Sequence, residues 1–299
     1  MSDGEEAADE PQPITPQPPR AFEKTPMFTA MNAARYQRQA LIREIEATEP
    51  KLLCYVAGNK APVDRFDTLA FVDMLHNVSV GDPIDLMLHT PGGDVDAAEK
   101  LITLVRGAVG EEGNLRVIVP DYAKSAGTLM ALGANQIVMS ASSELGPIDP
   151  QISSKDGNGS DIVYSVLTYL EAYNDARRGL REAPDDLSNR ITFEKFDPVV
   201  VRKFEAVKTR ARMFAENLLK RRGVNFSKVA TELMDINQYP SHGQMIGWEA
   251  ARTMGLPIDY RAPDDPIWRK YWALYCHLRL ALESSEQRIF ESNYVSLIM

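Results

Sequence analysis

Short apolar runs alternate with amphipathic stretches through the first half of this chain. Residues 64–77 and 95–109 place apolar side chains at the spacing of a helix face, and a further helix is expected from Ser125. The apolar runs between them are typical of buried strands: 52–57, 84–88, 115–119 and 136–140. Consecutive parallel strands need crossover helices of this kind. The alternation therefore predicts an α/β fold, with a mainly parallel sheet wrapped by helices.

The two ends of the chain differ from this central part. Residues 1–26 are acidic and proline-rich with almost nothing to bury, which predicts a disordered tail. A helix is expected over 25–48, where apolar residues stand among Arg and Glu. Residues 261–299 carry a stripe of aromatic and leucine residues, which predicts a C-terminal helix. For this stripe we favour an oligomer interface over a place in the core. The main domain is expected to cover 27–260.

Within that domain, residues 160–222 are expected to form a helical insertion. The helical pattern is interrupted around Pro184–Asp186 and at Asp197-Pro198. From the sequence alone the insertion could be an arm, a lid or a subdomain that packs on itself.

Composition narrows the class of protein. The chain has 299 residues, 44% apolar residues and a net charge of −9 from mixed charges, which argues against a dedicated nucleic-acid or anionic-membrane surface. Cys54 and Cys276 stand in apolar contexts, as free thiols in a reducing compartment do. No apolar run reaches the roughly 18–20 residues of a membrane span, and the N-terminus lacks a signal-peptide pattern. We expect a soluble, cytoplasmic protein.

Two of the expected strands end in turns of small residues that lead into helices. The first turn is Pro91–Gly93, and the second is Ser125–Gly127. Successive glycines leave backbone N–H groups that can point at one oxygen atom, as a developing oxyanion needs. A serine at a strand-to-helix turn has its hydroxyl beside the positive end of the helix dipole. Together the turns predict an oxyanion hole that faces a nucleophile.

These turns resemble the superfamily that joins the Clp protease proteolytic subunit, signal peptide peptidase A and the crotonases. The runs His89–Glu99, Ser125–Ala134 and Glu144–Gln151 are similar to the serine dehydrogenase proteinase family, and the resemblance covers residues 27–260. It implies a serine peptidase on a ClpP/crotonase fold of repeated β-β-α units, often oligomeric, in which helical insertions pack on neighbouring subunits. No expected strand is followed by G-x-G-x-x-G, so a nicotinamide cofactor has no support, and we expect no cofactor.

The resemblance assigns the reacting groups. Ser125 would attack an acyl carbonyl and form an acyl-enzyme. The oxyanion would accept hydrogen bonds from the backbone N–H of Gly92 or Gly93 and of Ala126. The alternative for Ser125 is a plain helix N-cap, which any helix would accept.

The general base departs from both peptidase patterns. Where the Clp subunit has a histidine after its serine, this chain has Leu145–Asp149, and the helix expected over 161–178 lacks the lysine of signal peptide peptidase A. His242 stands where the resemblance implies the third member of the Clp triad, and histidine suits a base near neutral pH. Lys124 and Lys155 are the other candidates for the base.

Two more residues lie near these motifs. Asp149 could orient the base or bind a backbone amide in its own turn. His89 is expected to be a strand residue beside the site. Lys124, next to Ser125 in sequence, should point away from the hydroxyl and bind substrate or a carboxylate.

The sequence thus predicts a cytoplasmic, homo-oligomeric serine peptidase that acts on a peptide or protein substrate. Metal-binding motifs are absent. Two rivals stay open: a crotonase-type acyl-CoA enzyme and a catalytically silent scaffold. The first would use acidic residues near the glycine turn, for which Asp94, Asp96 and Glu99 are available.

Overall fold

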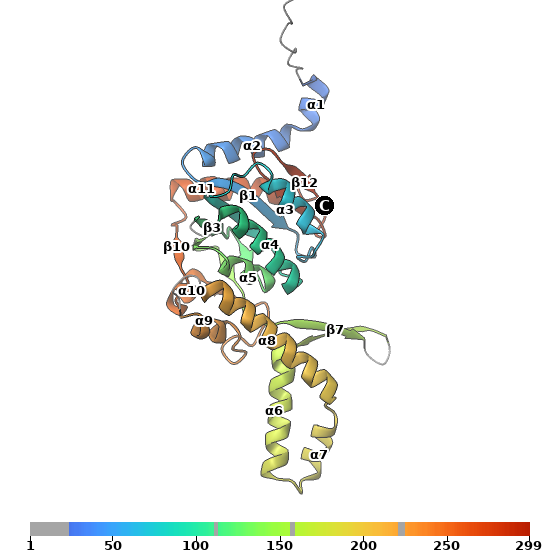
Figure 1. Cartoon of the computed structure of the whole chain (residues 1–299). Helices are drawn as coiled ribbons and strands as arrows, with labels where there is room; N and C mark the ends of the chain where they lie inside the picture. The colour runs from blue at the N-terminus through green and yellow to red at the C-terminus, as the bar shows by residue number, and fades with distance from the viewer. Residues whose placement is uncertain (1–23, 111–112, 156–158, 221–224) are drawn as a thin grey trace, which may run out of the picture. The chain divides into compact units, whose positions relative to one another are not determined.

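The computed structural model describes residues 24–110, 113–155, 159–220 and 225–299 (Figure 1). The chain divides into two units, residues 1–33 and 34–299. In the smaller unit, α1 (Pro26–Met31) begins after Thr25, whose hydroxyl accepts a hydrogen bond from the Phe28 N–H at 3.3 Å. The predicted disordered tail lies, up to residue 23, outside the described residues. The prediction of a single helix over 25–48 was wrong, because α1 ends before Asn32. A second helix, α2 (Ala33–Glu46), follows.

The larger unit is built on one seven-stranded sheet. The order is β10-β5-β3-β2-β1-β11-β12, in which the first five strands pair in parallel and the last two antiparallel. The strands are β1 (Lys51–Ala57), β2 (Ile84–His89), β3 (Leu115–Ile118), β5 (Gln136–Met139), β10 (Ile258–Tyr260), β11 (Arg288–Glu291) and β12 (Ser296–Ile298). The predicted α/β fold is confirmed.

Alternate residues of the central strands enter two different cores, as the pleat of a strand requires. Leu53 and Tyr55 of β1 pack with helices α3 (Asp67–Leu75), α4 (Val95–Val109) and α5 (Ala126–Leu132). Leu52 and Cys54, on the opposite face, pack with α2 and α11 (Pro266–Leu280). The sheet therefore has helices on both faces, as Figure 1 shows.

The C-terminal segment does not form the single interface helix that the sequence predicted. Its apolar stripe, which includes Trp268, Tyr271 and Leu274, is buried on the sheet of the same chain. After α11 the chain adds β11 and β12 to that sheet, and it belongs to the same compact unit as residues 34–260. A helical stripe shows that one face is covered but not by what, and in this structure the sheet of the same chain covers these residues.

Two small sheets surround the ends of the parallel strands. One contains β4 (Tyr122–Ala123), β6 (Glu144–Leu145) and β9 (Ile246–Gly247), which is followed by α10 (Trp248–Met254). The other is a hairpin of β7 (Gln151–Lys155) and β8 (Asp161–Ser165). The prediction of helix from residue 160 was wrong over β8.

The insertion itself contains α6 (Val166–Glu182), α7 (Leu187–Glu194) and α8 (Pro198–Lys220), and α9 (Phe226–Leu233) comes next. The predicted interruptions before α7 and α8 are confirmed. Val166, Leu170, Val201 and Phe204 form a small separate core between α6 and α8. The second half of α8 instead packs on α5 in the main core, so α8 reaches from the insertion to the sheet domain.

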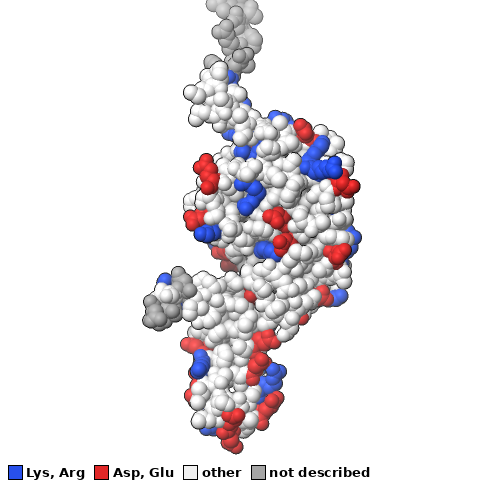
Figure 2. Space-filling model, turned by 180° about the vertical axis from the view of Figure 1, so that it is seen from behind, with Lys and Arg blue, Asp and Glu red and all other residues white. Residues whose placement is uncertain are grey.

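None of the described helices combines the length and the apolar composition that a membrane span requires. On the face drawn in Figure 2, Lys and Arg side chains are interspersed with Asp and Glu and separated by uncharged areas. This matches the mixed charge pattern of the sequence.

Candidate active site

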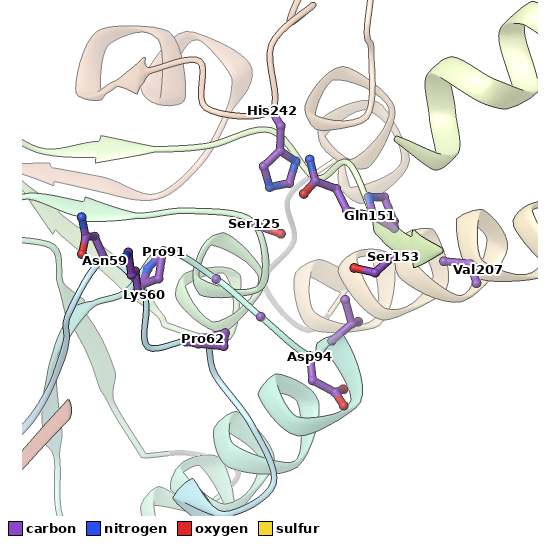
Figure 3. Close-up of a pocket in the computed structure, with 14 residues that line it drawn as sticks. Asn59, Lys60, Pro62, Pro91, Asp94, Ser125, Gln151, Ser153, Val207 and His242 are labelled. Atoms are coloured by element: carbon purple, nitrogen blue, oxygen red, sulfur yellow. The ribbon is translucent and has the colours of Figure 1, made fainter. Parts of the chain in front are cut away.

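The residues of both turns line one cavity of about 580 Å³ at the ends of β2 and β4 (Figure 3). Gly92, Gly93, Ser125 and His242 all line this cavity. The structure therefore brings the predicted glycine turn, the predicted nucleophile and one predicted base into a single space. His242 is more than a hundred positions from Ser125 in sequence, and only the fold joins them.

Ser125 has an unusual backbone conformation. Its φ is 51° and its ψ is −115°, and no other non-glycine residue among those described has a positive φ. Such a conformation costs on the order of 1–3 kcal/mol and persists only where surrounding contacts enforce it. Ser125 occupies the N-cap position of α5, but its side chain makes no capping hydrogen bond. The hydroxyl is therefore not engaged as a helix cap, which was the alternative role for this residue.

Hydrogen bonds on either side of Ser125 enforce the sharp turn. The Lys124 N–H donates to the Thr90 carbonyl at 3.0 Å, and the Gly127 N–H donates to the Lys124 carbonyl at 2.7 Å. The Thr128 hydroxyl donates to the Ala123 carbonyl at 2.8 Å. Both ends of the turn are thus held, and Ser125 stands at its apex.

The glycine turn approaches this apex closely. Gly92 and Gly93 have φ values of 104° and 148°, in the region that favours glycine. The Val63 N–H donates to the Gly92 carbonyl at 2.7 Å, and the Asp94 N–H donates to the Val63 carbonyl at 2.9 Å, which anchors the turn on the neighbouring loop.

The amide groups of the two turns are not equivalent. The Gly92 N–H donates to the Thr90 hydroxyl at 3.2 Å, so it is already used. The N–H groups of Gly93 and Ala126 have no hydrogen-bond partner among the described residues. Gly93 is exposed to the cavity, and Ala126 begins α5 directly after Ser125. Each of the two turns thus contains an N–H group without a partner among the described residues, and a developing oxyanion needs donors of this kind.

His242 and Asp149 are neighbours. The His242 Nδ1 atom lies 3.6 Å from Asp149 Oδ2, which is an ion-pair distance and longer than a hydrogen bond. This Nδ1 atom is buried and has no hydrogen-bond partner among the described residues, while the rest of the ring extends into the cavity. Asp149 is 7% exposed, and its Oδ1 accepts a hydrogen bond from the Ser165 hydroxyl at 2.8 Å. Asp149 is thus held with one oxygen toward the imidazole.

The two lysine candidates lie elsewhere. The Lys124 ammonium is paired with the Glu144 carboxylate, away from the cavity. Lys155 ends β7 and donates to the Gly159 carbonyl at 3.3 Å, and it does not line the cavity.

His89 is fully buried in β2, in contact with the rings of Tyr122 and Tyr275. Burial, followed by the nearby Arg279 cation, lowers the pKa of His89 to about 3. This imidazole is neutral at physiological pH and does not line the cavity.

The acidic residues that an acyl-CoA enzyme would use are engaged in structural contacts. The Asp94 carboxylate caps α4 by accepting from the Asp96 and Ala97 N–H groups at 2.7 and 3.0 Å. Asp96 and Glu99 both pair with Arg210 of α8. Among the described residues, no cluster of His, Cys, Asp and Glu side chains could hold a metal ion.

Further cavity-lining residues were not predicted from the sequence. Asn59 and Lys60 come from the loop after β1, Gln151 and Ser153 from β7, and Val207 from α8. β7 begins at Gln151, the last residue of the Glu144–Gln151 motif, and this was an available signal. Val207 carries no such signal, because only the packing of α8 brings it to the cavity.

Comparison with known proteins gives a family match and several similar proteins. Residues 67–172 match the family of ClpP-like SDH-type serine proteinases. Two uncharacterised proteins of Methanocaldococcus jannaschii are 32% and 38% identical to the chain, over 188 and 91 residues. These matches cover 61% and 30% of this chain and 56% and 27% of the relatives. The chain thus spans about half the length, or less, of the curated relatives it matches.

Two mutants of the 1510-N membrane-bound stomatin-specific protease are similar in structure, and the second is in complex with a substrate peptide. They share 17% and 16% sequence identity with this chain, at TM-scores of 0.45 and 0.36. The alignments cover 74% and 77% of this chain and 86% and 99% of those proteins.

The family match includes both turns of the cavity and Asp149. The resemblance that the sequence motifs predicted is confirmed: residues 67–172 are similar to the ClpP-like SDH-type serine proteinases.

Proposed function

We propose that this protein is a serine peptidase that cleaves peptide bonds through an acyl-enzyme on Ser125. The observation that carries the proposal is the strained backbone of Ser125, supported by the N–H groups of Gly93 and Ala126 in the two turns, which have no partner among the described residues. Strain of this kind is retained at functional sites, and a serine that only capped a helix would not need it. Loss of one oxyanion donor typically costs about 3–4 kcal/mol of transition-state stabilisation, so the paired donors are a large part of the proposed catalysis.

The reaction follows from these positions. The Ser125 Oγ forms a bond to the substrate carbonyl carbon, and His242 accepts the hydroxyl proton. The carbonyl oxygen becomes an oxyanion held by Gly93 and Ala126. Collapse of this intermediate breaks the C–N bond, and His242 passes its proton to the leaving amine. Water then hydrolyses the ester by the same steps, with His242 again as base.

Asp149 would orient His242 and stabilise its protonated form. The 3.6 Å separation from Nδ1 supports this role, because catalytic contacts are often long without substrate. In this assignment the aspartate occupies the segment where the Clp subunit has its histidine, and His242 stands at the position of the third triad member. The histidine and the aspartate would thus have exchanged their positions in the sequence, while their arrangement in space stays the same.

The acyl-CoA alternative has less support, because Asp94, Asp96 and Glu99 are all engaged in capping or ion pairs. The silent-scaffold alternative does not account for the strain at Ser125.

We further propose a cytoplasmic homo-oligomer. The free thiols of Cys54 and Cys276 support a reducing compartment. Exposed apolar side chains on β8 and α7, such as Val163 and Leu187, support contacts between subunits.

Labelling with a fluorophosphonate, measured by intact mass, tests the proposal. The wild-type protein should take up one probe, Ser125→Ala none, and His242→Ala should react at least about 100-fold more slowly. Asp149→Asn should fall between wild type and His242→Ala. If Ser125→Ala loses labelling while His242→Ala labels normally, then a residue other than His242 is the base. No wild-type labelling would leave the scaffold or acyl-CoA alternatives.

A further inference from the structure

Lys124 stands where three segments of the candidate site meet. Its backbone N–H donates to the Thr90 carbonyl at 3.0 Å, directly before the glycine turn. Its carbonyl accepts from the Gly127 N–H at 2.7 Å and so closes the turn around Ser125. A Cβ atom added to Gly92 would lie 2.8 Å from that carbonyl oxygen. The main chain of this one residue therefore ties the glycine turn to the nucleophile.

The side chain of Lys124 reaches a third segment, the loop that carries His242. The ammonium donates to the carbonyl oxygens of Gly243 at 3.4 Å and Gln244 at 3.3 Å. These are the two residues that directly follow His242. It also donates to the Leu145 carbonyl at 3.2 Å and pairs with the Glu144 carboxylate of β6. All of these acceptors are oxygens, and none belongs to the cavity.

This environment requires a cation with several donors. The Lys124 side chain is only 12% exposed, and a buried ammonium must be paired and hydrogen-bonded to be retained. Lysine has three N–H donors and no acceptor, which suits a ring of carbonyl oxygens with one carboxylate. The stem is confined as well, because a Cβ at Gly146 would lie 2.8 Å from Lys124 Cδ. The side chain has little freedom to turn toward Ser125.

We infer that Lys124 is a positioning residue. Its side chain holds the His242 loop against the turn that contains Ser125 and so positions the imidazole relative to Ser125. This inference rests on the proposed function of His242 as general base. The loop from residue 240 to residue 245 has few other contacts. The Gln244 N–H donates to the Ser241 carbonyl within the loop, the Gln244 side chain donates to the Gln238 carbonyl at 3.5 Å, and His242 Nδ1 lies 3.6 Å from Asp149, beyond hydrogen-bond distance. Without the ammonium, the loop would lose its hydrogen bonds to the Ser125 turn.

The variant Lys124→Met tests the inference, because it keeps the length of the stem and removes the donors. We expect it to label with fluorophosphonate about 10- to 100-fold more slowly than wild type, since small misplacements of a catalytic group have effects of this size. Lys51→Met is the matched control: Lys51 also pairs with a carboxylate, Asp82, and donates to a carbonyl, but outside the cavity. It should label at the wild-type rate.

A double-mutant cycle separates positioning from general damage. If Lys124 acts through His242, then Lys124→Met should slow labelling little, less than about threefold, in a His242→Ala background. The same full loss in both backgrounds would overturn the inference. Glu144→Gln removes the ion pair but leaves the ammonium on the loop carbonyls, so its labelling rate should stay within about threefold of wild type. An equal loss in Glu144→Gln would assign the effect to the ion pair alone.

Hydrogen exchange gives a readout that does not depend on activity. In Lys124→Met the amides of residues 241–246 should exchange faster, while those of β1 and β2 should be unchanged. If wild type fails to label, the proposed peptidase function fails, yet faster exchange of the loop would still establish the attachment. Unchanged exchange would refute it in either case. Lys124→Gln provides the same test if Lys124→Met does not fold. It keeps a donor for one loop carbonyl and should react at an intermediate rate.

Discussion

A Cβ atom added to Gly92 would lie 2.7 Å from the Cβ of Ser125, closer than such atoms approach in proteins. The glycine turn and Ser125 are therefore in direct contact. No side chain fits between them, and the position of one determines the position of the other.

Gly92→Ala should therefore abolish fluorophosphonate labelling, with a rate at least about 100-fold below wild type, because the added methyl displaces one turn from the other. The positive φ of 104° adds strain of about 1 kcal/mol or more. Gly81→Ala is the matched control: Gly81 has a φ of 95°, but a Cβ there meets no atom within 4 Å. It should lose similar stability and keep the wild-type rate. Equal rates for the two variants would contradict the close contact.

Ser125→Gly should be inactive and yet more stable than Ser125→Ala. Glycine adopts a φ of 51° and a ψ of −115° without the strain that a Cβ imposes, whereas alanine keeps it. After the entropic cost of glycine, we expect a net gain of roughly 1 kcal/mol in the free energy of unfolding, measured by urea denaturation. A glycine variant no more stable than the alanine variant would show that the Ser125 turn is unstrained.

His89→Gln should flatten the pH dependence of stability below neutral pH. The folded protein keeps His89 neutral down to its lowered pKa of about 3, whereas the unfolded chain protonates it below its ordinary value near 6.5. Between these values the unfolded state binds more protons, so the free energy of unfolding falls as the pH falls. From pH 6.5 to 4.5, wild type should lose about 2 kcal/mol more than His89→Gln. His76→Gln, at an exposed histidine, should follow wild type.

Leu274→Ala tests whether the C-terminal stripe is core. Leu274 is fully buried on the sheet, so its truncation should reduce the free energy of unfolding by about 2–5 kcal/mol. Leu280→Ala, in the same helix but 85% exposed, should change it by less than about 0.5 kcal/mol. Sedimentation should show the same association state for both variants. A change of association without loss of stability in Leu274→Ala would restore the interface assignment.

The sequence by itself determined the α/β fold and the two turns. The strand runs 52–57, 84–88, 115–119 and 136–140 each became a strand of the parallel sheet within a residue or two, because buried strands and amphipathic helices have distinct periodicities. Gly92, Gly93 and Ser125 could be identified because glycine pairs and a serine at a helix start are local patterns with a local chemical meaning. The family resemblance rested on the same residues.

Only the tertiary structure decided which groups meet around the serine. The neighbourhood of His242 and Asp149 depends on a loop and a turn that are more than ninety positions apart. In the proposed oxyanion hole, the preference for Gly93 over Gly92 depends on the Thr90 hydroxyl, which accepts the hydrogen bond of the Gly92 N–H. The burial of the C-terminal stripe depends on which face of the sheet was still uncovered. In each case the deciding contact joins distant segments, and local periodicity carries no information about such contacts.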